Sequence, residues 1–347
     1  MVTVQKSNNR VFYMDFLRVI SMFAVIILHT ASSKINSVDI GSLNWQVLNF
    51  FDSATRWCVP IFVMISGILF LNPKKEISIG NIYKKYIPRL LIILFAWNFL
   101  YAIFSCVVEH SFSLQTFISN ILLGPVHMWF LYMIIGLYMI TPFLRKIAHD
   151  DKLLKYFLVL WLIYSIITNI TQITGLSIVE TILEDKMFIN FIIGYSGYFL
   201  LGYFLSNKDY KSKWAITFTI ICFIITFLGT SVLSNGQAIT NQSLYSNFSL
   251  TTIGMSIGIF VLSKNLYSEK EEINNKFKNI ISVLSKYSLG IYIIHFWILN
   301  ILSKIKIDVL LLPPIINVIV ISIIIFLLSL LATFILSKFK YLKRLVL

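Results

Sequence analysis

Apolar residues occur along this chain in long continuous blocks, and charged residues are concentrated between the blocks. Most blocks have about the 20 residues that a helix needs to cross the hydrocarbon core of a bilayer. Because lipid offers no water to backbone groups, such blocks must form helices or a closed barrel. The blocks lack the short alternating segments of a barrel, so we predict helices.

The pattern predicts about ten transmembrane helices, with ends placed to within about three residues. The fold class is therefore all-α, a polytopic integral membrane protein, with residues 1–347 forming a single membrane-embedded domain. The longest hydrophilic loop is expected at about 265–286. The predicted spans are 13–33, 51–71, 89–108, 127–144, 154–173, 189–206, 214–233, 247–264, 287–303 and 315–337.

Composition agrees with this pattern. Of the 347 residues, 58% are hydrophobic and 13% are charged, and the mean hydropathy is +0.83. A soluble domain has about 25% charged residues, so the polar surface that a water-soluble globule needs is missing. The abundance of Ile, Lys and Asn is typical of an AT-rich bacterial genome, and we expect a multi-pass protein of the cell membrane.

The net charge of +14 follows the predicted topology. In a soluble protein such a charge would suggest nucleic acid, but here the basic residues form short clusters between spans, so no nucleic-acid partner is expected. With the N-terminus inside, every second loop is basic, and the positive-inside rule predicts that both termini are cytoplasmic. Five of the 29 basic residues then fall outside: Lys34, Arg56, Lys186, Lys304 and Lys306.

The first block is similar to a signal peptide, because Lys6 and Arg10 precede it. However, Arg18 and His29 lie inside the block and nine further spans follow, so a retained helix is predicted. Cys58, Cys106 and Cys222 are widely spaced, and we expect neither a disulfide nor a metal site. Without a P-loop, a nucleophile elbow or a zinc-protease motif, ATP-driven transport and classical hydrolysis lose support.

Arg18 and His29 are ionisable groups inside a span, where such groups are costly and usually functional. They are 11 residues apart, about 20° from three full turns and about 16 Å along a helix axis. Both therefore lie on one face, together with Met22 and Val25. An alternative is that Arg18 only pairs with Asp15 while His29 ends the span.

Further polar groups are expected at the outer side. Arg56 begins the second span, His127 begins the fourth, and His295 lies deep in the ninth. Each also has a structural interpretation. Arg56 could pair with Asp52 one turn earlier, and His295 could be a buried neutral histidine bonded to a neighbour.

On the inner side, Lys84, Lys85 and Arg89 precede the third span. Cations interleaved with aromatic residues at a membrane mouth suit a phosphorylated ligand. The alternative is that they serve topology and contact with anionic lipid. Trp129, at the outer end of the fourth span, is typical of an interfacial aromatic.

Four motifs in order give the chain a resemblance to the family-three acyltransferases, integral membrane enzymes that O-acylate glycans. It extends over about residues 10–340. The motifs are Arg18 and His29 in the first span; Val59-Pro60 with Ser66-Gly67 in the second; Trp129-Phe130-Leu131; and Tyr292 with His295, after Ser288-Leu289-Gly290.

The resemblance implies acetyl-CoA as the cytoplasmic co-substrate, without a metal, and a glycan hydroxyl as the acceptor outside. Arg18, with Lys84, Lys85 and Arg89, would hold the CoA phosphates or polarise the thioester carbonyl. His29 would act as general base or carry the acetyl group itself.

The same resemblance gives the remaining residues their expected roles. Arg56 and His127 would orient the acceptor or stabilise the oxyanion. Trp129, Tyr292, His295 and Ser66 would contact substrate or support the site.

The chain departs from the family pattern before the third span, where an arginine-rich run is reduced to Lys84, Lys85 and Arg89. It also lacks the extracytoplasmic hydrolase-like domain of some relatives, so the membrane domain is expected to transfer the acyl group directly to the acceptor. The alternatives are an exporter of surface polysaccharide and a membrane-embedded sensor or anchor. The sequence does not indicate an oligomeric state.

Overall fold

The computed structural model describes residues 12–109, 112–187, 193–267 and 274–347. Helices make up the described chain, and no strand occurs in it. The α-helices are α1 (Phe12–Ser32), α2 (Leu43–Thr55), α3 (Cys58–Leu71), α4 (Ile79–Asn81), α5 (Ile87–Glu109), α6 (Leu114–Leu123), α7 (Trp129–Ala148), α8 (Asp151–Thr174), α9 (Ser177–Thr181), α11 (Ser196–Ser206), α12 (Ser212–Ser234), α13 (Leu250–Leu266), α14 (Asn275–Lys304), α15 (Pro314–Leu336) and α16 (Lys343–Val346).

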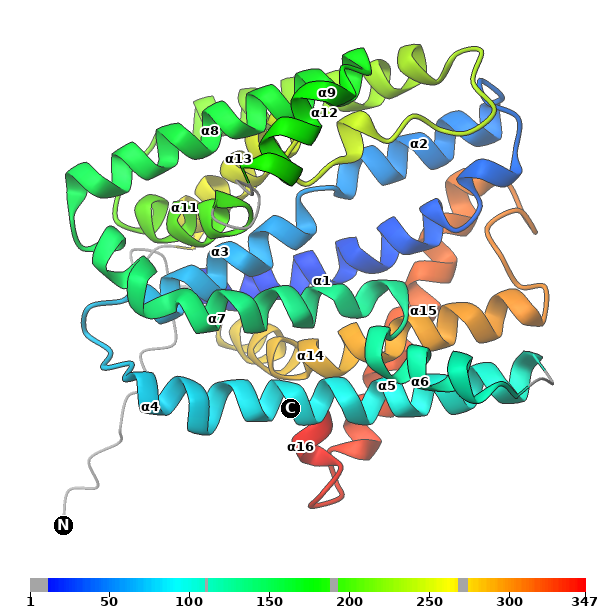
Figure 1. Cartoon of the computed structure of the whole chain (residues 1–347). Coiled ribbons are helices and arrows are strands. Elements are labelled where there is room, and N and C mark those ends of the chain that lie inside the picture. The colour runs from blue at the N-terminus through cyan, green and yellow to red at the C-terminus, as the bar shows by residue number, and fades with distance from the viewer. Residues whose placement is uncertain (1–11, 110–111, 188–192, 268–273) are drawn as a thin grey trace.

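Most of the long helices run roughly along one direction, with α1, α3 and α14 between the layer of α5 and α6 and that of α8 and α12, whereas α15 is steeply inclined to them (Figure 1). Within the described residues, nine helical stretches are long and apolar enough to cross a membrane. This confirms an all-α polytopic membrane protein. Of the sixth predicted span, 189–206, the structure describes α11, which is 11 residues long; residues 188–192 lie outside the described chain.

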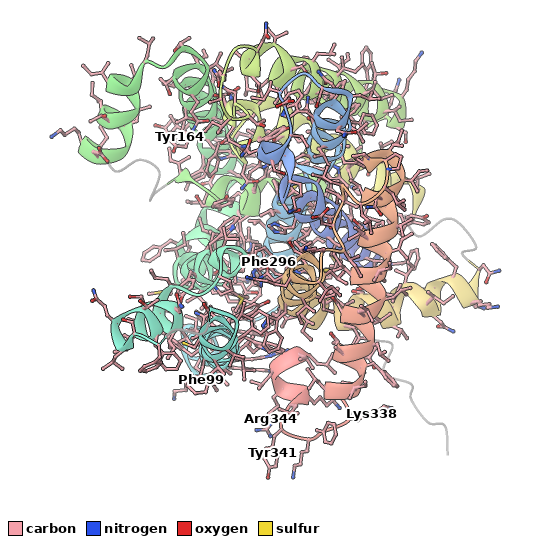
Figure 2. All side chains as sticks on the ribbon, turned by 90° about the vertical axis from the view of Figure 1, so that its right-hand side faces the viewer. Phe99, Tyr164, Phe296, Lys338, Tyr341 and Arg344 are labelled. Atoms are coloured by element: carbon pink, nitrogen blue, oxygen red, sulfur yellow. The ribbon has the colours of Figure 1, made fainter. Side chains whose placement is uncertain are left out.

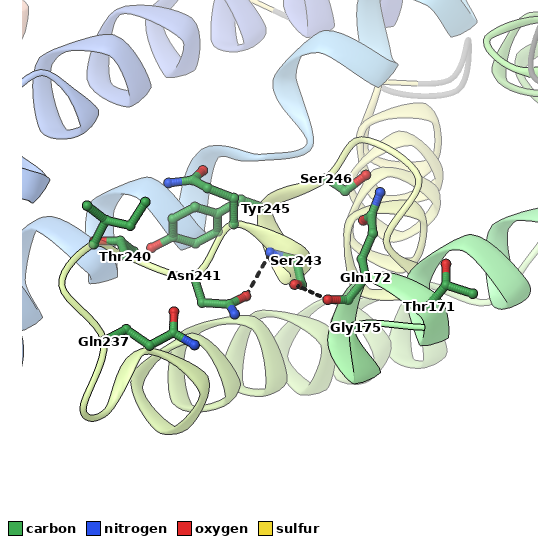
Figure 3. Close-up of a pocket in the computed structure, with 11 residues that line it drawn as sticks. Thr171, Gln172, Gly175, Gln237, Thr240, Asn241, Ser243, Tyr245 and Ser246 are labelled. Carbon is green, nitrogen blue, oxygen red and sulfur yellow. Dashed lines mark hydrogen bonds between the residues drawn. The ribbon is translucent and has the colours of Figure 1, made fainter. Parts of the chain in front are cut away.

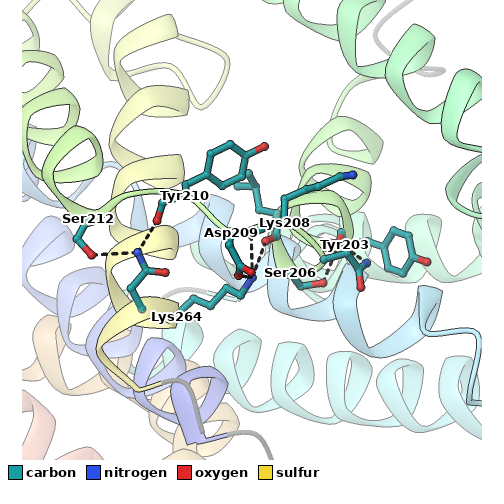
Figure 4. Close-up of polar contacts among 10 residues, drawn as sticks. Tyr203, Ser206, Lys208, Asp209, Tyr210, Ser212 and Lys264 are labelled. Atoms are coloured by element: carbon teal, nitrogen blue, oxygen red, sulfur yellow. Dashed lines mark hydrogen bonds and ion pairs between the residues drawn. The ribbon is translucent and has the colours of Figure 1, made fainter. Parts of the chain in front are cut away.

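Loops that the charge pattern assigns to one side meet at one end of the bundle. Arg145 on α7 donates to the carbonyl of Phe70 at 2.6 Å. Lys264 at the end of α13 donates to the carbonyl of Lys208 at 2.8 Å and pairs with Asp209 (Figure 4). We call this the basic end. At the opposite end, Lys34 pairs with Asp308 at 3.1 Å.

The second predicted span, 51–71, is two helices. The chain bends between α2 and α3, at Arg56 and Trp57. Pro60 causes the break, because it has no N–H to donate to the carbonyl of Arg56 and its ring crowds that turn. Arg56 therefore lies at an interruption within the span, because α2 already begins at Leu43.

Two other predicted boundaries are also wrong, and one helix was not predicted. Residues 79–109 are continuously helical, through α4, a π-helical turn η2 (Ile82–Tyr86) and α5. The helix α6 and the 3₁₀ turn η3 (Val126–Met128) precede α7. The expected loop at 265–286 is largely the polar first half of α14, which begins at Asn275.

Glycines allow α3 and α11 to pack at backbone distance. A Cβ at Gly67 would lie 1.8 Å from the carbonyl oxygen of Phe199, and one at Gly202 would lie 2.3 Å from that of Met64. Small residues at such crossings are typical of membrane helices, where close packing replaces the hydrophobic effect as the source of association. This explains Gly67 in the second predicted motif.

Candidate active site

Three histidines from distant parts of the sequence meet near the opposite end of the bundle. His29 comes from α1, His127 from η3 and His295 from α14. The ring centroids of His29 and His295 are 5.4 Å apart, and those of His127 and His295 are 5.3 Å apart. The ring of Phe296 lies near all three, with its centroid 5.6 Å from that of His29, 4.8 Å from that of His127 and 6.3 Å from that of His295. Figure 2, viewed from this end, shows Phe296 well inside the helical bundle.

Two of the three rings are fixed and buried. His127 and His295 are each 1% exposed. A ring nitrogen of His127 (Nε2) lies 3.3 Å from the carbonyl of Ile293, and Nδ1 of His295 contacts the carbonyl of Tyr292. A carbonyl only accepts, so these nitrogens carry the proton. The other nitrogen of each ring, Nδ1 of His127 and Nε2 of His295, has no partner in the described part of the chain and keeps its lone pair.

His29 differs from the other two histidines because its side chain is only partly buried. Within the described residues its ring forms no hydrogen bond, so a reactant could approach it. Met22 and Val25, predicted on the same face of α1, are 1% and 2% exposed. His29 therefore presents the accessible imidazole, with His127 and His295 behind it. His29 also lies near the end of α1, as the alternative interpretation has it, but its ring in addition lies 5.4 Å from that of His295.

Two tyrosines hold the cluster in place. Tyr292 donates its hydroxyl to the carbonyl of His127, and Tyr101 on α5 donates to the carbonyl of Ile293 at 2.8 Å. The turn that delivers His127 is fixed by Gly124, which has a φ of +68° and has no room for a Cβ beside Asn98. Sequence reasoning missed Tyr101, because an aromatic residue in a span gives no signal of its own.

Arg56 and Asp52 form a buried ion pair beside this cluster. Arg56 Nη2 lies 2.5 Å from Asp52, whose side chain is fully buried. The guanidinium also lies 3.9 Å above the ring of Tyr245 and donates to its backbone carbonyl at 3.3 Å. It is within electrostatic range of His29. The predicted pair with Asp52 is confirmed, and Arg56 is also brought to the outer site.

At the basic end, Arg18 pairs with Asp15 at 3.1 Å, and Ser285 donates to the same carboxylate at 2.7 Å. The alternative of an Asp15 pair is thus also confirmed. Arg18 and Arg89 both lie within electrostatic range of Tyr138 on α7, whose hydroxyl interacts with Ser66. The structure therefore joins three predicted site residues around Tyr138, which the sequence did not single out.

Aromatic rings complete this inner group. Phe70 stacks on Tyr138 with centroids 4.0 Å apart, and Tyr86 lies 5.0 Å from Phe70. Lys84 and Lys85 lie in η2 and are exposed, as is Arg89. The guanidinium of Arg89 contacts the carbonyl of Leu347. The structure thus brings Arg89, but not the two lysines, to Tyr138.

The remaining predicted residues have mainly packing contacts. Trp129 is 36% exposed and its ring lies 5.5 Å from that of Tyr195, an arrangement that fits an interfacial aromatic. Ser66 donates to the carbonyl of Phe62 at 2.9 Å. In the described residues no group of three or more histidine, cysteine or acidic side chains is arranged to hold a metal.

Comparison with known proteins gives one finding. No curated protein and no solved structure matches the chain. The family model for the acyltransferase 3 domain matches residues 11–338, which include the histidine cluster, the Arg56 pair and the group around Tyr138. Since the match extends over nearly the whole chain, this protein belongs to the acyltransferase 3 family of membrane acyltransferases.

Proposed function

We propose that this protein transfers an acetyl group from acetyl-CoA at the basic end to a hydroxyl of a glycan at the opposite end. The observation that supports it most is the position of His29. A partly exposed imidazole stands beside two buried ones. It lies on the same helix as Arg18, which is within electrostatic range of Tyr138 at the basic end. Arg18 and His29 are about 16 Å apart along α1. An extended pantetheine arm is suited to such a separation.

The proposed donor contacts follow from charge. Arg18 and Arg89, which both lie within electrostatic range of Tyr138, would hold the CoA phosphates, for which a guanidinium is suited. The exposed Lys84 and Lys85 would attract the polyanionic donor to this end. The acetyl thioester would then extend along α1 toward His29.

Two chemical routes remain open at His29. In direct transfer, the imidazole removes the proton of the sugar hydroxyl, the oxygen attacks the thioester carbonyl, and the C–S bond breaks to release CoA thiolate, which takes up the proton. In a relay, a nitrogen of His29 attacks the thioester carbonyl first, the C–S bond breaks, and the released CoA thiolate takes up the imidazole proton. The sugar hydroxyl then attacks the acetyl-imidazole, the C–N bond breaks, and the hydroxyl proton returns to the ring nitrogen. Arg56 would stabilise the oxyanion of either intermediate.

The exporter alternative requires a wide polar path. Met22 and Val25, between Arg18 and His29 on the same face, are almost fully buried. This packing leaves no wide polar path on that face of α1, which counts against the passage of a polymer; passage of the thioester arm along this face would require Met22 and Val25 to move.

The test uses purified protein in lipid nanodiscs with acetyl-CoA labelled in the acetyl group. Neutral and charged oligosaccharides serve as acceptor probes, and wild type is compared with His29→Ala. We expect label on an oligosaccharide hydroxyl with wild type and none above background with the variant. Equal transfer by His29→Ala, or none by correctly folded wild type, would overturn the proposal.

A further inference from the structure

A polar cavity of about 650 Å³ opens at the opposite end of the molecule, between the end of α8 and the loop that connects α12 to α13. Its volume falls within the usual range of small-molecule sites. Figure 3 shows Gln172 and Gly175 on one side and the segment from Gln237 to Ser246 on the other. No residue of this cavity belongs to the predicted site.

The lining of this cavity is polar but uncharged. Four amide side chains face it, together with hydroxyls and one tyrosine, and none of its lining residues is Lys, Arg, Asp or Glu. An amide offers both donors and an acceptor, so it pairs with hydroxyls and acetamido groups of sugars. A carboxylate or phosphate would find no cation in this lining. The amides are Gln172, Gln237, Asn241 and Gln242.

The backbone around the cavity is fixed by internal hydrogen bonds. Ser243 makes two of these bonds. Its hydroxyl donates to the carbonyl of Gln172 at 2.8 Å, and its N–H donates to Asn241 Oδ1 at 3.0 Å (Figure 3). Trp45 Nε1 donates to Thr240 at 3.0 Å. By contrast, the side-chain amides of Gln172, Gln237 and Gln242 form no hydrogen bond with any residue that the structure describes. A preformed frame that leaves its amides available is suited to a ligand.

Tyr245 connects this cavity to the reaction site. It lines the cavity, its hydroxyl donates to Asn49 at 2.6 Å, and the guanidinium of Arg56 lies over its ring. Arg56 in turn is within electrostatic range of His29. Tyr245 and Arg56 therefore lie between the cavity and His29, and a glycan that reaches His29 would have to extend several residues beyond the stretch held in the cavity.

A second cavity, of about 360 Å³, lies between α5, α6 and α14 and provides a comparison. Tyr101 lines it, so it also adjoins the histidine cluster. Its lining contains Lys304 and several apolar side chains, among them Phe104 and Val108, with Asn120 and Asn300 as the only amides. This lining is less suited to an uncharged sugar chain.

We infer that the amide-lined cavity binds an uncharged stretch of the acceptor glycan, several residues away from the hydroxyl that is acylated. The inference rests on the proposed function for its link to His29, but not for binding itself. It makes the loop 237–246 and the end of α8 a determinant of acceptor specificity.

The test is binding of the protein in nanodiscs to an array of neutral, anionic and cationic oligosaccharides. The variants are Gln172→Ala with Gln242→Ala, as a pair, and Asn300→Ala as the matched amide control in the second cavity. We expect wild type to bind neutral oligosaccharides, the paired variant to lose at least about 10-fold in affinity, equivalent to about 1.4 kcal/mol, and Asn300→Ala to bind like wild type.

Three results would overturn the inference: no binding of neutral oligosaccharides, unchanged binding by the paired variant, or loss only in Asn300→Ala. His29→Ala separates this inference from the proposed function. If it binds neutral oligosaccharides normally while wild type transfers no acetyl group, the binding site stands and the proposed function fails. If wild type transfers acetyl groups and the paired variant equals wild type in binding and in KM for the oligosaccharide, the proposed function stands and the inferred binding site fails.

Discussion

Arg18 and His29, both on α1, lie in contrasting surroundings. Arg18 is a partly exposed cation whose charge is balanced by Asp15, next to an aromatic group with exposed cations nearby. His29 lies against two imidazoles that are almost fully buried and that each keep a lone pair without a partner in the described chain. One end is thus suited to holding an anion, and the other to moving a proton or an acyl group. Under the proposed function, donor binding and chemistry would be separated along one helix.

The largest expected effect comes from removing the accessible imidazole. We expect His29→Ala to lower kcat by about 10²–10⁴-fold, the range for loss of a general base, with little change in KM for acetyl-CoA. Steady-state kinetics in nanodiscs measures both. If KM for acetyl-CoA rises and kcat is unaffected, binding and chemistry are not divided as described.

The Asp52–Arg56 pair should affect stability more than any surface charge. Asp52→Ala leaves a buried guanidinium without its carboxylate, and loss of one partner of a buried pair costs about 3–5 kcal/mol. Thermal unfolding in detergent should show the loss. In the double variant Asp52→Ala, Arg56→Met, which removes both charges, we expect most of the stability to return. A double variant as unstable as the single one would contradict this explanation.

Arg18 should influence donor binding. A hydrogen bond to a charged group contributes about 1.5–3 kcal/mol, so Arg18→Ala should raise KM for acetyl-CoA by roughly 10–100-fold, and Arg18→Lys should do so less. Lys146, a cation of the same end on α7, provides the control as Lys146→Ala. If Arg18→Ala and Lys146→Ala have the same KM for acetyl-CoA, Arg18 does not contact the donor.

The smallest effect is expected at the exposed lysines. Exposed charges contribute about 0–1 kcal/mol each, so Lys84→Ala and Lys85→Ala should each raise KM for acetyl-CoA by less than about 5-fold, and the effect should vanish at high salt. An effect as large as that of Arg18→Ala at high salt would mean that these side chains contact the donor directly.

Much of this arrangement could be predicted from the sequence, because it follows from local rules. Block length predicts membrane helices, and helical periodicity places Arg18 and His29 on one face. The break at Arg56 is not predicted, although Pro60 is its signal, because the predicted span 51–71 treats the end of α2 and all of α3 as one continuous helix. The sequence predicts a loop where the polar first half of α14 lies, because a polar helix that does not enter the membrane gives no hydropathy signal.

The contacts between distant segments could not be derived in this way. His295 is 266 positions from His29, and no local rule brings α14 against α1. Tyr101 and Tyr138 carry no motif, so only packing identifies them. The amide-lined cavity is assembled from α8 and a loop more than 60 residues later, and single glutamines in loops are too common to stand out.

The most direct test of the central claim is the sidedness of transfer. Protein is reconstituted in liposomes, its orientation is determined by protease accessibility of the basic loops, labelled acetyl-CoA is placed on one side, and neutral oligosaccharides on the other. We predict label on the oligosaccharides when acetyl-CoA faces the basic end, and none when the two solutions are exchanged. Transfer only when donor and acceptor share one side would contradict an acyl group passing along α1 from Arg18 to His29.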